Sequence, residues 1–151
     1  PYAPRLEAGD ALNFELRANA VVLARSADGR ARRHDVVMQE KKRLLAERGL
    51  PRWAEWTTAD RPALPDLVRR ACSAWLLARS DRLGVEFDAD ALRAEAYMQH
   101  RGKNDELRSS TVALSGRLRV VNSEALGSAL RDGIGHGKAF GCGLMMLRPV
   151  G

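Results

Sequence analysis

Cysteine and long apolar runs are scarce in this sequence, and both shortages exclude classes of protein. The longest uncharged apolar stretches, residues 75–78 and 144–147, fall far short of the about 18 residues that a membrane-spanning helix needs. Cys72 and Cys142 stand seventy positions apart without a C-x-x-C pair, which is unlike the disulfide framework of a small secreted protein. We therefore expect a protein that does not span a membrane and that works in the reducing cytoplasm.

Histidine is also scarce, and the common nucleotide-binding motifs are missing. His34, His100 and His136 have no H-x-x-x-H spacing and no cysteine or carboxylate partner at ligand spacing, so no metal or other cofactor is predicted. A Walker A motif would need glycine at Asp132 and serine or threonine at Ala139, and no register matches G-x-G-x-x-G. ATP and NAD are not expected, and the aromatic pattern of an RRM strand is absent as well.

The sequence does contain enough apolar residues for one core, together with an excess of arginine. Its 151 residues are 45% hydrophobic and 29% charged, which is typical of one folded domain. The formal net charge is +6, and 21 of the 25 basic residues are arginines. Residues 91–151 hold nine basic and five acidic side chains. Because the arginine fork suits phosphate and base edges, a nucleic acid or another anionic partner is predicted.

The first ten residues differ in character from the rest of the chain. They lack a starting methionine, contain Pro4 and Gly9, and show little periodicity, which is typical of a linker. We expect residues 1–10 to be a linker from a preceding domain, and residues 11–151 to be the C-terminal domain of a longer protein.

Hydrophobic periodicity predicts alternating strands and helices. Apolar residues alternate over residues 12–19, as in a half-buried strand, and recur at helical spacing from Pro65 to a stop at Gly84. Residues 92–99 alternate again, and we favour a strand there over a helix despite the alanine content. With residues 112–120 they predict a hairpin.

The last part of the chain completes a recognisable order. Asn122 and Gly133 bound a second helix, and residues 144–147 predict a strand buried on both faces or covered by helices. The order βαββαβ is that of the ferredoxin-like fold. We therefore expect an α+β protein with a four-stranded antiparallel sheet and helices on one face.

Three further segments lie between the first strand and the long helix. Residues 25–33 are predicted to be a polar, basic turn, and residues 36–48 a short helix closed by Gly49 and Pro51. Residues 52–65 form an insertion with two tryptophans, to which we assign no function.

A glycine-rich segment, GIGHGKAFGCG, precedes the last strand. Its five glycines are Gly133, Gly135, Gly137, Gly141 and Gly143. Glycine permits positive φ and close backbone approach, so successive amides can point at an anion, with Lys138 adding a charge. The alternative is a tight connection that needs glycine only for packing. His136 is a weak catalytic candidate because a loop of this kind can bring it beside a phosphate; otherwise it is an exposed loop residue.

The predicted hairpin tip gathers four basic side chains: His100, Arg101, Lys103 and Arg108. A protruding basic turn can grip phosphates or enter a groove. Arg117 and Arg119 share one face of the following strand and could extend the same basic surface. The alternative is a solvated loop whose field is diluted by Asp105 and Glu106.

Three segments carry a family resemblance. They are LEAGDALNFELRANAV at residues 6–21, VALSGRLRVVNSEAL at 112–126 and LRDGIGHGKAFGCGLMMLRP at 130–149. Together they resemble the CasE-type CRISPR repeat-RNA endoribonucleases, the processing subunits of the Cascade complex. The last segment is the most specific, because it is similar to the glycine-rich loop of CRISPR repeat-processing proteins and the strand after it.

The resemblance implies an enzyme of two tandem ferredoxin-like domains, of which this chain would be the second. Such enzymes cut precursor CRISPR RNA at the base of the repeat hairpin without metal, in antiviral defence. The adjacent 2′-hydroxyl attacks the phosphate and leaves a 2′,3′-cyclic phosphate. The family's catalytic histidine and tyrosine belong to the first domain, and no position here matches them. This chain alone is therefore expected to be inactive.

The resemblance also implies binding roles and partners. Arg101 and Lys103 fall where the family inserts arginines into the RNA stem. The glycine-rich loop with Lys138 falls where the family approaches the scissile region and packs against the first domain. The implied partners are the CRISPR repeat hairpin RNA, an N-terminal ferredoxin-like domain and other Cascade subunits.

Two other functions stay open from the sequence. One is a ferredoxin-like RNA-binding module without catalysis. The other is a small ferredoxin-like enzyme that binds an anionic metabolite at the glycine-rich loop, with His136 as its acid-base group. RNA affinity that falls steeply with salt would favour the RNA-binding functions, because counterions are released from the RNA on binding.

Overall fold

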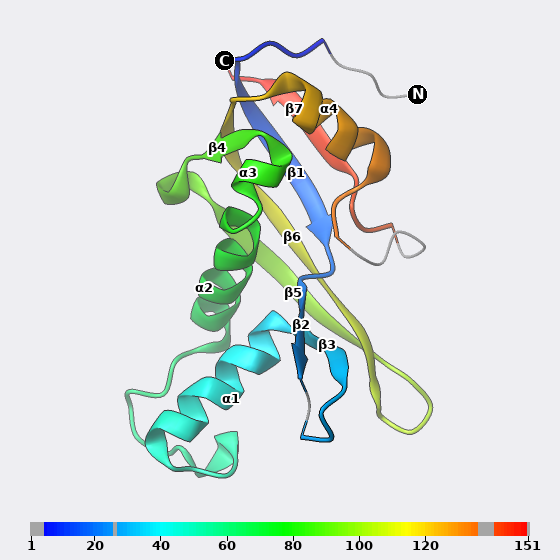
Figure 1. Cartoon of the computed structure of the whole chain (residues 1–151). Helices are drawn as coiled ribbons and strands as arrows, with labels where there is room; N and C mark the ends of the chain where they lie inside the picture. The colour runs from blue at the N-terminus through cyan, green and yellow to red at the C-terminus, as the bar shows by residue number, and fades with distance from the viewer. Residues whose placement is uncertain (1–4, 26, 136–140, 151) are drawn as a thin grey trace.

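The structure is a computed structural model that describes residues 5–25, 27–135 and 141–150. An antiparallel sheet forms its centre (Figure 1). Its strands are β1 (Ala11–Ala18), β4 (Val85–Phe87), β5 (Arg93–Arg101), β6 (Leu107–Val120) and β7 (Met145–Pro149). The order is β4-β6-β1-β7, and β5 also pairs with β6. β1 pairs with one edge of β6. β4 and β5 pair with some of the same β6 residues, so both of them must lie along the opposite edge of β6.

Helices cover one face of this sheet. They are α1 (Val36–Arg48), α2 (Leu64–Leu77), α3 (Ser80–Leu83) and α4 (Ser123–Asp132), with short 3-10 turns η1 (Trp53–Glu55) and η2 (Ala89–Ala91). Figure 1 shows α2, α3 and α4 in front of the sheet, with α1 packed beside α2. Alternate strand residues such as Leu16 and Leu114 are buried against helix residues such as Leu67 and Leu126. The period-two pattern therefore places one apolar face of the sheet under the helices.

The helices begin and end at residues suited to those positions. Asn122 caps α4 by accepting a hydrogen bond from Ala125 N at 3.1 Å, and Asp35 caps α1. Gly84 ends α3 with φ 70°. A Cβ at Gly84 would lie 2.4 Å from the carbonyl oxygen of Asn122. Only glycine therefore allows the end of α3 to approach the start of α4 so closely.

The α+β class is confirmed, and so are the predicted strand at residues 12–19, the helix at 36–48 and the β5–β6 hairpin. The choice of a strand over a helix at residues 92–99 is also confirmed. The prediction of a plain four-stranded sheet is corrected, because the main sheet has five strands and a second sheet joins β2 (Val21–Arg25) to β3 (Ala31–Asp35).

The β2–β3 hairpin occupies the segment that the sequence predicted to be a polar turn. The two strands pair from Val21 opposite Asp35 to Arg25 opposite Ala31, around the Asp28-Gly29 turn. Because β3 has the polar sequence ARRHD, it shows no apolar alternation. That signal is the one on which strand prediction depends.

Two other expectations are corrected. The helix predicted to run to Gly84 breaks after α2, where Arg79 turns back and donates from Nη1 to the carbonyl of Trp75 at 2.9 Å. For the last strand, burial on both faces is wrong and the alternative of a strand covered by helices holds, since Met145 is buried in the core and Met146 is 45% exposed. β7 lies at the edge of a sheet whose helices cover one face only.

The segment at residues 5–10, predicted to be a linker, contacts the sheet. Gly9 N donates to the carbonyl of Val120 at 2.7 Å, and Val120 N donates to the carbonyl of Asp10 at 2.8 Å. Among the described residues, a helix that could span a membrane is not found.

Candidate nucleic-acid interface

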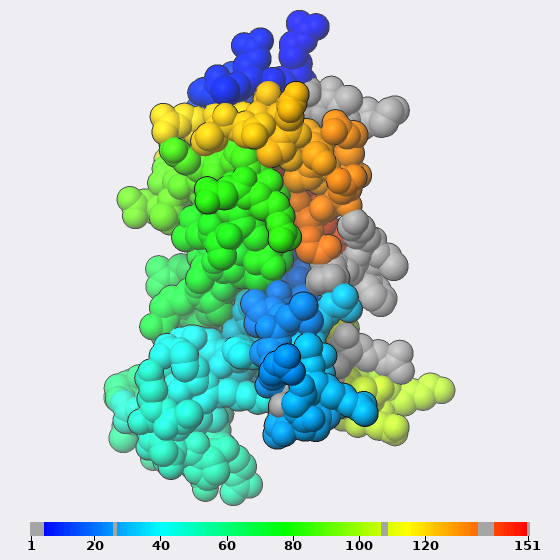
Figure 2. All heavy atoms as spheres, viewed as in Figure 1, coloured from blue at the N-terminus to red at the C-terminus, as the bar shows by residue number. Residues whose placement is uncertain are grey.

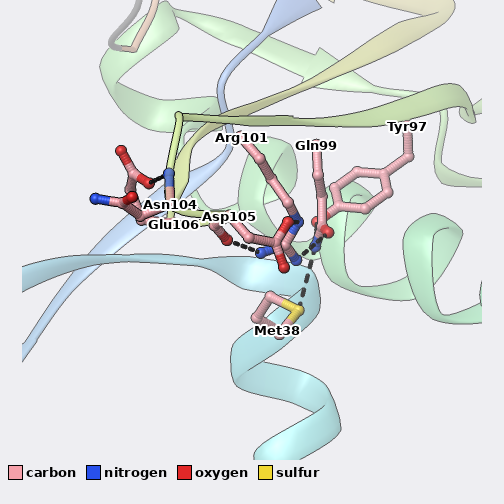
Figure 3. A network of polar contacts seen from close by, with 7 residues as sticks. All are labelled: Met38, Tyr97, Gln99, Arg101, Asn104, Asp105 and Glu106. Atoms are coloured by element: carbon pink, nitrogen blue, oxygen red, sulfur yellow. Dashed lines mark hydrogen bonds and ion pairs between the residues drawn. The ribbon is translucent and has the colours of Figure 1, made fainter.

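The tip of the β5–β6 hairpin is an ordered turn built around Arg101 (Figure 3). Gly102 N donates to the carbonyl of Glu106 at 2.8 Å, and Asp105 adopts a positive φ of 59°. Arg101 donates from Nη1 to the carbonyl of Asp105 at 2.9 Å and from Nη2 to Oε1 of Gln99 at 2.8 Å. These bonds use two of the five guanidinium N–H donors. The Nε of Arg101 also lies 3.9 Å from Oδ1 of Asp105, an ion pair. The turn therefore orients the arginine and still leaves guanidinium donors for a ligand.

The other predicted tip residues lie in different surroundings. Lys103 is exposed at the end of the turn. His100 is half-buried, and its Nε2 lies 3.2 Å from Oγ1 of Thr111 across the strand pair. Arg108 belongs to β6, but its side chain lies outside the described residues. Arg101 and Lys103 are thus the two described cations at the tip.

A buried carboxylate supports the base of this hairpin. Asp35 is 8% exposed and accepts hydrogen bonds from Val37 N at 2.7 Å and Met38 N at 3.0 Å. It also accepts a hydrogen bond from the Tyr97 hydroxyl at 2.8 Å and one from Oγ of Ser110. One side chain therefore joins the end of β3, the start of α1 and both strands of the β5–β6 hairpin.

The surroundings of the Tyr97 hydroxyl favour its protonated form. Burial raises the pKa of its hydroxyl well above the ordinary value, and the hydrogen bond to Asp35 raises it further. Gln99 Nε2 donates to the same hydroxyl oxygen at 3.2 Å and lies 3.3 Å from the Met38 sulfur (Figure 3). The polar contacts thus run from the buried carboxylate through Tyr97 and Gln99 to Arg101 at the tip.

Arg117 and Arg119 do not extend the basic surface of the tip. Arg117 stands ten residues along β6 from its start at Leu107, about 33 Å at the rise of a strand. Arg117 pairs with Asp88 at 3.4 Å and Arg119 with Glu86 at 2.5 Å. These arginines lie on the open face of the sheet, where carboxylates offset their charge.

Gly135 and Gly143 of the glycine-rich loop pack closely near the end of β1. Ile134 N donates to the carbonyl of Gly143, and Gly143 N donates to the carbonyl of Arg17, both at 2.8 Å. A Cβ at Gly135 would lie 3.2 Å from the Trp75 ring. Packing therefore accounts for Gly135 and Gly143.

The middle of this loop, with His136, Gly137 and Lys138, lies outside the described residues. Gly133 and Gly141 have positive φ values of 85° and 78°.

A hollow of about 230 Å³ beside the described part of the loop is lined by Arg79, Arg82 and Gly133 among others. Burial, and then the nearby charge of Arg82, lower the pKa of Arg79.

Sequence reasoning missed the junction at Asp35 and Tyr97. Asp35 directly precedes the predicted helix, and aspartate is a preferred residue at that capping position, so the local sequence held a usable signal. Tyr97 lies 62 positions from Asp35, and nothing local connects the two.

In the described part of the chain, no group of three or more histidine, cysteine or acidic residues is placed to hold a metal ion.

Comparison with known families assigns the chain. A family model described as "CRISPR associated protein" matches residues 1–149. The chain belongs to this family. The CRISPR-associated endoribonuclease Cse3 of Thermus thermophilus is 28% identical over 161 aligned residues, covering 99% of this chain and 61% of the relative. The chain therefore spans about three fifths of the length of that curated relative.

Solved structures agree with the family. A structure of the CRISPR endoribonuclease Cse3 bound to 19 nt RNA is 26% identical, with a TM-score of 0.59 over 99% of this chain and 58% of that one. The CRISPR-associated protein Cas6e from Escherichia coli K-12 is 22% identical, with a TM-score of 0.59 over 99% of this chain and 66% of that one. The second likeness shows the fold alone. The resemblance predicted from the sequence is confirmed at the level of the family.

Proposed function

We propose that this chain is the RNA-binding part of an endoribonuclease that processes CRISPR precursor RNA. The proposal rests chiefly on the likeness, over almost the whole chain, to the endoribonuclease Cse3 solved with a 19 nt RNA. The excess of arginine and the basic hairpin tip support it. Within the cytoplasm, the chain would act with the other subunits of the Cascade complex.

The β5–β6 hairpin is the element that grips the RNA. It projects to the lower right of the view, away from the helices (Figure 1), and carries Arg101 and the exposed Lys103 at its turn. The major groove of an A-form stem is narrow, so side chains enter it near helix ends or loops. A two-stranded ribbon with a pre-oriented arginine suits such an entry, because little side-chain freedom is lost on binding.

Cleavage then follows from the chemistry of RNA itself. The 2′-hydroxyl beside the scissile phosphate attacks the phosphorus, the bond to the 5′-oxygen breaks, and a 2′,3′-cyclic phosphate and a 5′-hydroxyl remain. This metal-independent reaction needs a base for the 2′-hydroxyl proton and an acid for the leaving oxygen. We assign these proton transfers to a preceding N-terminal ferredoxin-like domain, and we assign recognition of the repeat hairpin to residues 11–151.

The test is a gel assay of the 151-residue chain with the host's CRISPR repeat hairpin RNA in EDTA, against an unrelated hairpin of equal length. We expect selective binding without cleavage. Arg101→Ala should weaken binding about tenfold, because it removes charge-assisted bonds. Arg69→Ala is the matched control, because Arg69 is an exposed helix residue paired with Asp66 and should leave affinity unchanged.

Three outcomes would contradict the proposal. Equal affinity for both hairpins would remove selective recognition, and unchanged affinity of Arg101→Ala would remove the hairpin from the interface. Cleavage by the chain alone would place the proton transfers within these residues instead of a preceding domain. His136 would then be the first residue to replace.

A further inference from the structure

A second basic feature lies between α1 and the β2–β3 hairpin. The two elements border a pocket of about 540 Å³, visible in Figure 2 between the cyan helix and the blue hairpin. Its polar lining consists of Arg25, His34, Gln39, Lys42 and Arg43, and its other lining residues are alanines. None of these described lining residues is acidic. The pocket is therefore rich in hydrogen-bond donors.

His34 gives the pocket an unsatisfied polar atom. Its Nε2 is buried and has no hydrogen-bond partner among the described residues. Buried polar atoms without partners cost free energy, and most such atoms in folded proteins are satisfied. His34 lies on β3 opposite Val22 and also lines the pocket. His34 therefore adds an imidazole with an unsatisfied ring nitrogen to the residues that line the pocket.

The cations of the pocket differ in how far they are already neutralised. Arg43 bridges Glu40 and Glu47, at 2.7 and 2.5 Å. Among the described residues, Arg25 donates only to a neutral group, the carbonyl of Gly29, at 2.8 Å. Lys42 is exposed on α1, and no ion pair is found for it in the described part of the chain. Lys42 and Arg25 therefore supply the uncompensated charge.

We propose that this pocket binds a backbone phosphate of the RNA held by the β5–β6 hairpin. A phosphate has only acceptor oxygens and a negative charge, which match an amine, a guanidinium, an amide and an imidazole N–H. Asp35 lies at the end of β3 and bonds to both strands of the β5–β6 hairpin. One RNA molecule can therefore contact both hairpins (Figure 1). The inference rests on the proposed function, because the phosphate belongs to the same RNA.

The decisive variant is Lys42→Ala in the full 151-residue chain, measured by titration with the repeat hairpin RNA at several salt concentrations. We expect affinity to fall about tenfold. The slope of log affinity against log salt should decrease by about 0.7 to 0.9, the value for one lost phosphate contact. Lys42 is exposed and alanine favours helix, so the variant should fold normally.

Lys41→Ala is the matched control. Lys41 is the neighbouring lysine of the same helix, but its Nζ lies 5.2 Å above the Trp53 ring and does not line the pocket. This variant should keep both the affinity and the salt slope of the unchanged chain. Equal losses in the two variants would mean a diffuse charge effect and would overturn the pocket assignment.

Two further results separate this inference from the proposed function. If Arg101→Ala weakens binding but Lys42→Ala does not, the pocket assignment is wrong and the proposed function stands. If the chain binds no repeat RNA, the proposed function fails and the inference falls with it.

A titration with inorganic phosphate, followed through the His34 imidazole resonances, tests the source of the phosphate. If phosphate shifts His34 while Lys42→Ala leaves RNA affinity unchanged, the pocket is a free-anion site and the proposal is overturned.

Discussion

The two β-hairpins both carry basic side chains, but the rest of the molecule supports them differently. The β5–β6 hairpin continues the main sheet, since β6 also pairs with β1 and β4. The β2–β3 hairpin forms a sheet of its own, and within the described residues its strands pair only with each other. It is joined to its surroundings at its base, where Asp35 and Val21 lie. One hairpin is thus an extension of the core, and the other is attached at one end.

The two hairpins show that basic side chains can be carried by a rigid element or by a more mobile one. Elements with few buried contacts open locally at low free-energy cost, whereas core strands open only with the whole domain. We therefore expect the β5–β6 tip to be a pre-formed contact. We expect the β2–β3 hairpin to move more readily about its base.

The largest expected effect comes from the same substitution in each hairpin. Leu114 on β6 is 1% exposed and Leu23 on β2 is 73% exposed. Leu114→Ala should lower the free energy of unfolding by about 2 to 5 kcal/mol, because it leaves a cavity in the core. Leu23→Ala should change it by no more than about 0.5 kcal/mol. Urea unfolding measures both, and similar losses would show that the β2–β3 hairpin is buried after all.

A smaller effect is expected at the junction between the hairpins. Asp35→Ala removes the cap of α1 and leaves Tyr97 and Ser110 without their acceptor, which should cost about 3 kcal/mol. Hydrogen exchange should show the β2–β3 amides losing protection before the β5–β6 amides. The control is Asp28→Ala, because Asp28 pairs with Arg32 on the exposed turn and should matter by less than about 1 kcal/mol. Equal protection of the two hairpins in Asp35→Ala would contradict this account.

A third expected effect is gradual and appears only at alkaline pH, at Cys72 near the junction. Burial, and then the charge of Asp35, raise the pKa of Cys72 from 9.0 to about 12. As pH rises, the unfolded chain loses the Cys72 proton before the folded chain does. The free energy of unfolding therefore decreases as pH rises from the lower to the higher of these two pKa values. The expected slope for one such group is about 1.4 kcal/mol per pH unit.

Unfolding experiments across pH 9 to 11 check this slope, with Cys72→Ala as the control. The alanine variant should show a smaller dependence on pH, although Tyr97 still contributes in the same direction. An identical slope in both proteins would mean that Cys72 ionises as readily in the folded chain as in the unfolded one.

Much of the fold was predictable because its signals are local. The apolar alternation along β1 and the helix caps at Asn122 and Gly49 each depend on a few neighbouring residues of the sequence. The β2–β3 hairpin was not predicted, because β3 is polar and its sheet has no apolar face to reveal it. The break after α2 depends on Arg79 folding onto Trp75, a contact that helical periodicity does not encode.

The candidate site was predictable only in part. The basic residues of the β5–β6 turn stand next to one another in sequence, so their grouping needed no fold. The Lys42 pocket depends on a helix packing beside a strand pair, and His34 alone gave no reason to connect it with Lys42. Arg117 and Arg119 share one face of a strand, which allowed them to extend the basic surface of the tip, but the length of β6 separates them from it.

Trp75 has a consequence for experiments on this protein. Its indole donates from Nε1 to the carbonyl of Val21 at 3.0 Å, its ring lies 4.0 Å from the Arg79 guanidinium, and Gly135 approaches the ring edge. It therefore touches the base of the β2–β3 hairpin and the start of the glycine-rich loop at once. With Trp53 and Trp56 replaced by phenylalanine, the fluorescence of this one indole would act as an intrinsic optical probe. Its emission would change as either segment shifts, without any attached dye.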